Sequence, residues 1–204
     1  MLLMIATGRP VEMKIFTPCS FACSIAFIVD AGICTIGVES TVVEVREDGV
    51  TILRPGGITK EMLETVVENV VYDPFLSSQN EAPKAPGMKY KHYAPDAPMR
   101  AFIGSPADVA DAFTKVIRER ENNRGAFLVS EETYDLLKGN VNGEFHVYGH
   151  HGDAVRLAHN FYKSLHYFNE CGVDYILAEG VENSGLGVAV MNRMDKACGG
   201  QIIY

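Results

Sequence analysis

The sequence lacks both a membrane-spanning run and an excess of basic residues. No stretch reaches the roughly 18 consecutive apolar residues that a spanning helix needs. Lys and Arg total 18 against 26 Asp and Glu, which gives a formal net charge of -8. Because non-specific nucleic-acid binding depends on clustered cations that neutralise phosphates, this balance argues against a general nucleic-acid binder. We expect no membrane partner.

Cysteines are few, and their spacing does not repeat. The chain has five: Cys19, Cys23, Cys34, Cys171 and Cys198. No closely spaced pair is followed by a second one, which argues against a structural zinc site. Reduced thiols in a cytosolic protein are therefore the simplest interpretation. An apolar stretch from Met13 to Val29 resembles a signal peptide, but Pro18 and Ser20 interrupt it. We expect a cytoplasmic protein.

Motifs of the common catalytic and metal-binding classes are also missing. No nucleophile elbow is present, and no carboxylate pair has a spacing that fixes its geometry. Gly185-Leu-Gly187 lacks the third glycine of a dinucleotide-binding loop and lies late in the chain, so a tight turn is favoured over a nucleotide site. Four residues could be metal ligands by type: His146, His150, His151 and Asp153. Adjacent histidines on a loop usually point apart, so we predict no metal.

The clearest positive feature is a β-hairpin between residues 37 and 57. An Asp48-Gly49 turn separates Gly37-Val-Glu-Ser-Thr-Val-Val43 from Ile52-Leu-Arg-Pro-Gly-Gly57. A hairpin aligns the start of one strand with the end of its partner, so Ser40, Thr41 and Arg54 should lie at the same end. Two hydroxyls beside a guanidinium could bind a phosphate or carboxylate. A surface hairpin that ends in a solvated arginine is the alternative.

The residues around this hairpin predict further elements. Residues 24–29 indicate a short buried strand before it. After it, Thr59 should cap a helix whose core-facing stripe has helical spacing: Met62, Leu63, Val66, Val67 and Val70. Five of the nine prolines fall between Tyr72 and Pro98, so this stretch can form neither a long helix nor a central strand. We expect an extended linker there.

From Met99 onward, strand patterns alternate with helix patterns. Strands are predicted at 99–103, 125–129, 145–148 and 175–178, and helices at 105–117, 130–137, 153–170 and 188–197. Such alternation is typical of a parallel sheet covered on both faces. The fold class is therefore α/β, with a Rossmann-like, mostly parallel sheet in the C-terminal half.

Three motifs resemble a known family. The run Gly37–Val43 with Ile52–Thr59 is similar to the late part of the YrdC-like α+β domain of threonylcarbamoyl-AMP synthases. Pro86–Pro95 resembles the linker of their long, two-domain members, and Gly185–Arg193 with Lys196-Ala197 resembles the end of their second domain. The resemblance implies a partial YrdC-like catalytic domain at 1–71, of which 1–27 is unmatched. A linker at 72–98 and a C-terminal α/β domain at 99–204 would follow.

The resemblance also implies an activity and a set of site residues. Threonylcarbamoyl-AMP synthases, which are nucleotidyltransferases, convert L-threonine, bicarbonate and ATP into threonylcarbamoyl-adenylate and pyrophosphate, for tRNA threonylcarbamoyladenosine modification. By the resemblance, Ser40 contacts threonine with support from Thr41, and Arg54 holds the ATP phosphates. His92 and Tyr93 would close over the nucleotide, and Mg²⁺ would accompany ATP. Further expected partners are tRNA or the downstream threonylcarbamoyl-transferase complex. No catalytic residue is assigned.

The chain departs from the family pattern upstream of the hairpin. It contains no Lys-x-Arg pair, and its single Ser-x-Asn, Ser78 to Asn80, lies in the expected linker. We therefore expect an N-terminally truncated member that is inactive alone. The alternative is a non-catalytic regulatory or nucleotide- or RNA-binding module. A third interpretation is an unrelated α/β protein with a nucleotide at Gly185-Leu-Gly187.

Overall fold

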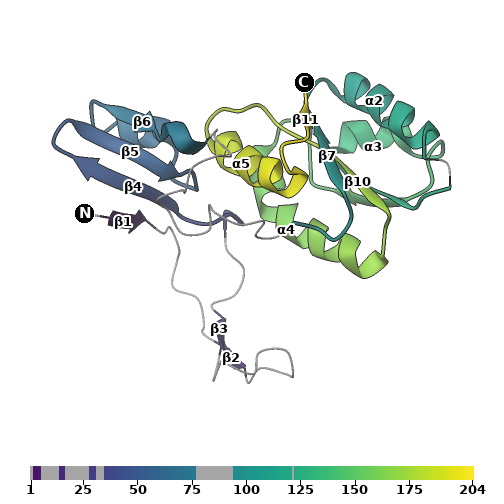
Figure 1. Cartoon of the computed structure of the whole chain (residues 1–204), viewed down its shortest axis with the longest axis horizontal. Helices are drawn as coiled ribbons and strands as arrows, with labels where there is room; N and C mark the ends of the chain where they lie inside the picture. Colours follow the sequence, from purple (N-terminus) through teal and green to yellow (C-terminus); the bar gives the residue numbers. More distant parts are fainter. Residues whose placement is uncertain (1, 6–13, 17–27, 31–34, 77–93, 121) are drawn as a thin grey trace.

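The described part of the protein forms two main sheets, with helices of the C-terminal half between them. The computed structural model describes residues 2–5, 14–16, 28–30, 35–76, 94–120 and 122–204. Figure 1 shows the N-terminal sheet on one side and the C-terminal sheet on the other, with α5 between them. In these residues no helix combines the length and apolar character required to traverse a lipid bilayer.

The N-terminal sheet is built on the predicted hairpin. Its strands are β1 (Leu2–Ile5), β4 (Thr41–Arg46), β5 (Gly49–Arg54) and β6 (Val70–Tyr72), in the order β1-β4-β5-β6. β4 pairs with β1 and β5 in antiparallel fashion, and β6 runs parallel to β5. Two further strands, β2 (Lys14–Phe16) and β3 (Ile28–Asp30), pair with each other and, among the described strands, with no other. Residues 24–27 of the predicted early strand lie outside the described residues.

The helix predicted after the hairpin is much shorter than its apolar spacing indicated. Thr59 caps it as expected, since its side chain accepts a hydrogen bond from the Met62 amide at 3.4 Å. However, α1 covers only Lys60–Glu64, and Val66 is 77% exposed. Val70 lies in β6 and pairs with Val50. Leu63, Val67 and Val70 face the core of this sheet as predicted, whereas Met62 and Val66 are exposed. The continuous helix was wrong because Val70 pairs with the edge of β5, and such pairing overrides local helical periodicity.

The C-terminal sheet confirms the α/β prediction. Five strands follow the order β11-β7-β10-β8-β9, and every pairing is parallel. The strands are β7 (Met99–Phe102), β8 (Gly125–Val129), β9 (Glu144–Val147), β10 (Tyr175–Glu179) and β11 (Ile202–Ile203). The helices are α2 (Pro106–Arg118), α3 (Glu131–Leu137), α4 (Ala154–Cys171) and α5 (Leu186–Cys198).

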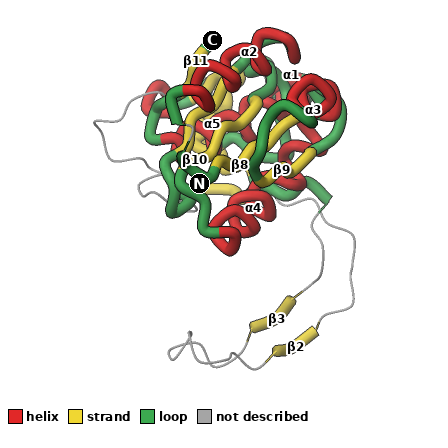
Figure 2. Tube along the Cα trace, turned by 90° about the vertical axis from the view of Figure 1, so that its right-hand side faces the viewer, coloured by secondary structure: helices red, strands yellow, loops and turns green. Residues whose placement is uncertain are grey.

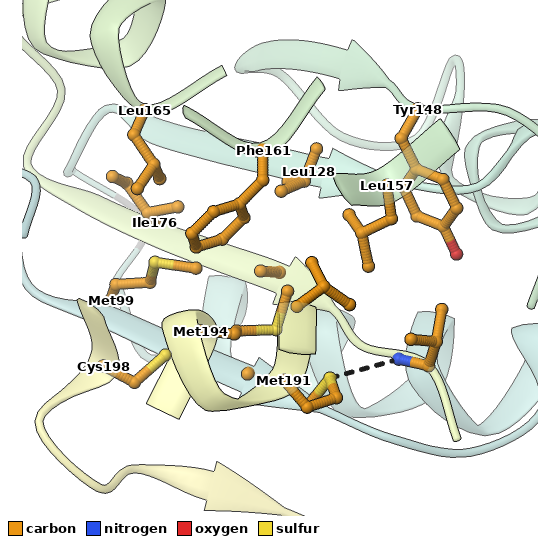
Figure 3. Packing of buried hydrophobic residues seen from close by; sticks show 14 of the residues in the cluster. Met99, Leu128, Tyr148, Leu157, Phe161, Leu165, Ile176, Met191, Met194 and Cys198 are labelled. Carbon is orange, nitrogen blue, oxygen red and sulfur yellow. Dashed lines mark hydrogen bonds between the residues drawn. The ribbon is translucent and has the colours of Figure 1, made fainter. Parts of the chain in front are cut away.

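Helices cover both faces of this sheet. One core cluster joins α2 and α3 to Phe102, Phe127 and Leu177, and the other joins α4 and α5 to alternate residues of the same strands. Figure 2 shows α4 on one side of the strands and α2 with α3 on the other. Every residue of β8 and β10 is buried, as expected for the middle of a parallel sheet. In Figure 3, Met191 of α5 accepts a hydrogen bond from the Val181 amide at 3.4 Å.

The expected linker is described only at its ends. A single 3-10 turn, η1 (Pro74–Leu76), follows β6, and residues 94–98 lead without regular structure into β7. Residues 77–93 lie outside the described part of the chain. The domain boundaries at 71–72 and 98–99 remain predictions.

Candidate functional site

The hairpin brings Ser40 and Arg54 together. Val42 pairs with Arg54 across β4 and β5, which places Ser40 beside the arginine side chain. Arg54 Nε donates to the Ser40 carbonyl at 3.0 Å, and Nη2 donates to Ser40 Oγ at 3.2 Å. Arg54 is only 7% exposed, so it is not the solvated hairpin end that was the alternative. A buried guanidinium beside a hydroxyl is suited to an anionic or zwitterionic ligand.

Thr41 has a different environment from Ser40. Its hydroxyl donates to the Ile58 carbonyl at 2.7 Å and accepts from the Ile58 amide at 3.0 Å, and the residue is fully buried. A Cβ at Gly56 would lie 2.4 Å from the Thr41 amide nitrogen, so glycine is needed for this close approach. Thr41 therefore fixes the start of β4 to the segment after β5.

Glu39, the residue before Ser40, is held by the C-terminal half of the chain. Arg193 Nε of α5 donates to Glu39 Oε2 at 2.8 Å, and the Tyr162 hydroxyl of α4 donates to Oε1 at 3.2 Å. Burial by itself would raise the pKa of Glu39, but the charge and hydrogen bond of Arg193, with smaller help from Tyr162, outweigh it. The pKa of Glu39 is lowered, so the carboxylate stays charged between its two partners.

Gly37 lets the irregular segment before Ser40 approach α4 closely. Its φ is +73°, and a Cβ there would lie 2.5 Å from His159 Cα and 2.6 Å from the Ala158 carbonyl oxygen. Both atoms belong to the backbone of α4 and cannot move aside alone. The segment 37–40 is thus fixed by backbone contact as well as by the Glu39 ion pair.

A third cation completes a corner that is rich in positive charge. Burial is the main cause that lowers the pKa of Lys196 to about 8, and the charges of Arg193 and Arg54 lower it further. The Arg193 side chain is 5% exposed, and its Nη2 has no hydrogen-bond partner among the described residues. Arg54, Arg193 and Lys196 lie near the carboxylates of Glu39 and Asp195, and the positive charge that exceeds theirs favours the binding of an anion.

Arg193 and Lys196 were not predicted as site residues. The sequence does contain a signal for them, because both belong to the Gly185–Ala197 motif and three positions apart on a helix place them on neighbouring faces. The motif does not reveal that the partner of Arg193 is Glu39. Glu39 lies 154 positions earlier in the chain. His92 and Tyr93, which were predicted to cover the nucleotide, lie outside the described residues.

The histidines considered as metal ligands have other partners. His151 Nδ1 is 2.8 Å from Glu179 Oε1, and His146 Nδ1 is 2.8 Å from Ser164 Oγ. His150 lies 3.3 Å from Glu132 on the surface. Within the described ranges, no group of three or more His, Cys, Asp or Glu side chains could hold a metal ion.

Gly185 and Gly187 form a tight turn at the start of α5. Gly185 has a φ of +51°, and the Gly187 amide donates to the Ser184 carbonyl at 2.8 Å. A Cβ at Gly187 would lie 2.0 Å from the Glu182 carbonyl oxygen. The glycines are therefore explained by the turn, and the Gly187 amide is not available to an anion.

Comparison with known proteins agrees with this architecture. Residues 58–199 match the family model described as threonylcarbamoyl-AMP synthase, C-terminal domain. The threonylcarbamoyl-AMP synthase of Bacillus subtilis is 41% identical over 179 residues, which cover 88% of this chain and 50% of that protein. The synthase of Pyrococcus abyssi is 38% identical, over 86% of this chain and 50% of that protein. The chain thus spans about half the length of the curated relatives that it matches.

Solved structures of the Pyrococcus abyssi protein, Sua5, have the same fold. Its complex with L-threonine superposes with a TM-score of 0.74 at 37% identity, over 85% of this chain and 49% of that one. A variant in which an adjacent His and Tyr are both replaced by Ala superposes with a TM-score of 0.70 at 35% identity, over 83% of this chain and 47% of that one. The parallel sheet, the hairpin corner and these matches agree, and the chain belongs to the threonylcarbamoyl-AMP synthase family through its C-terminal domain.

Proposed function

We propose that the corner of Ser40 and Arg54 is part of a site that makes L-threonylcarbamoyladenylate from L-threonine, bicarbonate and ATP. The product would supply the threonylcarbamoyl group for adenosine modification in tRNA. The observation that carries the proposal is the buried Arg54 guanidinium hydrogen-bonded to Ser40 at one end of the hairpin. This geometry occurs in a chain whose relatives are named threonylcarbamoyl-AMP synthases.

The reaction needs positioning and charge neutralisation more than it needs a nucleophilic side chain. The threonine amine takes up carbon dioxide from bicarbonate, with loss of water, and becomes a carbamate. A carbamate oxygen then attacks the α-phosphorus of ATP, the bond to the bridging oxygen breaks, and pyrophosphate leaves. A protein accelerates such a step by aligning the reactants and stabilising the phosphate charge.

Each residue is given one role in this proposal. We assign the threonine contact to Ser40, supported by Thr41, and the phosphate contacts to Arg54, with Arg193 and Lys196 adding positive potential. A solved relative is complexed with L-threonine, which agrees with the first assignment. The adjacent His92 and Tyr93 would cover the nucleotide; a variant of that relative with an adjacent His and Tyr replaced has also been solved.

Mg²⁺ would enter with ATP. Glu39 is already held by Arg193 and Tyr162, so we assign no protein ligand to the ion, which the phosphates would carry. When bound, Mg²⁺ neutralises phosphate charge. Within the chain itself, Arg54 and its cationic neighbours supply the complementary positive charge.

Binding and turnover separate this proposal from its alternative. We expect calorimetry to detect ATP binding that is weakened at least about tenfold in Arg54→Lys, because lysine keeps the charge but loses the planar fork. Arg46→Lys is the control, since Arg46 is an exposed hairpin residue that pairs only with Glu44 among the contacts described. Equal ATP affinity in wild type and Arg54→Lys would instead favour a non-catalytic binding module. In that case, the amide NMR signals that shift on addition of ATP should belong to residues 99–204.

Turnover by this chain alone should be low. The family's Lys-x-Arg pair is absent, and the single Ser-x-Asn lies at Ser78 to Asn80. We therefore expect little or no pyrophosphate release from threonine, bicarbonate and ATP. Robust release would contradict the idea that residues outside this chain complete the site.

A further inference from the structure

A cavity lies between the two sheets and borders the Ser40–Arg54 corner, because Pro55 lines it. Its volume is about 540 Å³, within the range of small-molecule sites. One wall is the face of α5 that carries Val188, Met191, Asn192 and Asp195. The opposite wall comes from the end of β6 and η1, around Tyr72 and Pro74. Arg193 of α5, which binds Glu39, is not among the residues that line the cavity.

The cavity lies beyond the carboxyl ends of strands β7 and β10 of the C-terminal sheet, where ligands commonly bind. Ile103, directly after β7, and Asn183, in the loop after β10, both line it. β7 and β10 are neighbours, but the chain leaves β7 for α2 on one face and β10 for α5 on the other. In open α/β sheets, the crevice at such a switch beyond the carboxyl ends of the strands is the usual place for a ligand.

The charge of the lining is negative. Asp73 and Asp195 line the cavity, and none of the described residues that line it is a lysine, arginine or histidine. The Asp195 carboxylate makes no hydrogen bond or ion pair with the described residues. Burial raises its pKa, and the neighbouring charge of Lys196 offsets this only in part. A phosphate or carboxylate ligand would be repelled, and a neutral one would leave Asp195 without a partner.

The remaining lining suits the body of an organic molecule. Val188, Met191 and Ile202 offer apolar surface, and Tyr72 adds an aromatic ring that can interact with a cation. The Asn183 amide can accept a hydrogen bond from an ammonium or guanidinium, whereas Asn192 Oδ1 already accepts one from Arg193 Nη1 at 3.1 Å. These groups come from both sheets, so one ligand would contact both.

We propose that this cavity binds a small organic cation, with its ammonium or guanidinium group at Asp195 and its apolar body along α5. ATP and bicarbonate are anions and L-threonine is a zwitterion, so none of the proposed substrates fits this charge pattern. The site is therefore additional to the proposed activity, and it can be tested without turnover.

A series of probes with one body and three charges tests the proposal. We would titrate the chain with 3-phenylpropylammonium, 3-phenylpropanol and 3-phenylpropionate, and follow backbone amides by NMR with calorimetry for affinity. The cation should bind about tenfold more tightly than the alcohol, a difference of about 1.4 kcal/mol. The anion should not bind. Shifted amides should lie at 72–76 and 188–195.

Variants distinguish the cavity from non-specific attraction to an acidic protein. Asp195→Asn should reduce the affinity for the cation to that for the alcohol, whereas Asp135→Asn, on the exposed surface of α3, should change neither. Val188→Phe should fill the cavity and abolish binding of both. Equal affinity for cation and alcohol in the wild type would overturn the proposal, as would unchanged cation binding in Asp195→Asn or tighter binding of adenosine.

Discussion

At the scale of single residues, the contact with the greatest consequence is the one between Glu39 and Arg193. The Arg193 side chain is 5% exposed and the Glu39 side chain 31% exposed, so the pair is neither a surface salt bridge nor fully buried. Removing one partner of a desolvated pair costs more than the pair is worth, because the other charge is left without compensation. Glu39 also adjoins Ser40, so its position affects the candidate site.

Arg193→Met should destabilise the protein by about 2 kcal/mol, between the values for exposed and buried pairs. Urea unfolding would measure this change in the free energy of unfolding. Arg46→Met is the control: its ion pair with Glu44 is exposed, and the midpoint should not move. If Arg193→Met behaves like the control, the ion pair does not stabilise the fold.

The lowered pKa of Glu39 predicts a specific pH dependence. A carboxyl whose pKa is lower in the folded than in the unfolded state stabilises the fold above its unfolded pKa, and this contribution disappears as the pH falls through the folded pKa. The loss should therefore occur in the acid range below the usual glutamate value. Urea midpoints from pH 7 downward should decline less steeply in Glu39→Gln than in wild type. Parallel curves would show that Glu39 does not titrate differently on folding.

At the scale of elements, helix caps and strand alternation were readable from local sequence, whereas α1 was not. Ser105 and Ser130 cap α2 and α3, as their side chains predict. The valines after α1 have helical spacing, but Val70 pairs in β6 instead. A short apolar run is compatible with the spacing of a helix and with that of a strand, and pairing with a neighbouring strand determines which one forms.

The contact between Gly37 and α4 gives a prediction at this scale. Gly37→Ala would place a methyl group against backbone atoms of α4 and should destabilise the fold by about 2 kcal/mol more than a glycine change without such a contact. Gly139→Ala is a matched control, because Gly139 has a φ of +82° with nothing within 4 Å of an added Cβ. Urea unfolding of both variants isolates the contact, and equal losses would mean that α4 yields to the methyl group.

At the scale of the whole molecule, α5 connects the two sheets. It packs in the core of the C-terminal sheet through Met191 and Met194 (Figure 3). It also holds Glu39 through Arg193 and lines the cavity through Asp195. A helix with three such faces should transmit changes between the sheets, because each contact fixes the same rigid element.

Hydrogen exchange should reveal this coupling. In Arg193→Met, amides of β4 and β5 should exchange at least about tenfold faster, because a loss of about 1.4 kcal/mol raises an opening equilibrium tenfold. Amides of β8 and β10 lie in a separate core and should keep their wild-type rates. Equal acceleration in both sheets, or in neither, would show that the ion pair does not join them selectively.

The sequence by itself determined the hairpin, the α/β alternation and the meeting of Ser40 with Arg54, since each depends on residues that are close along the chain. Only the tertiary structure decided that Thr41 faces Ile58, that Arg193 binds Glu39, and that Asp195 borders a cavity. The physical reason is distance along the chain: strand and helix periods are local, whereas the partners of a buried charge are chosen by how whole elements pack.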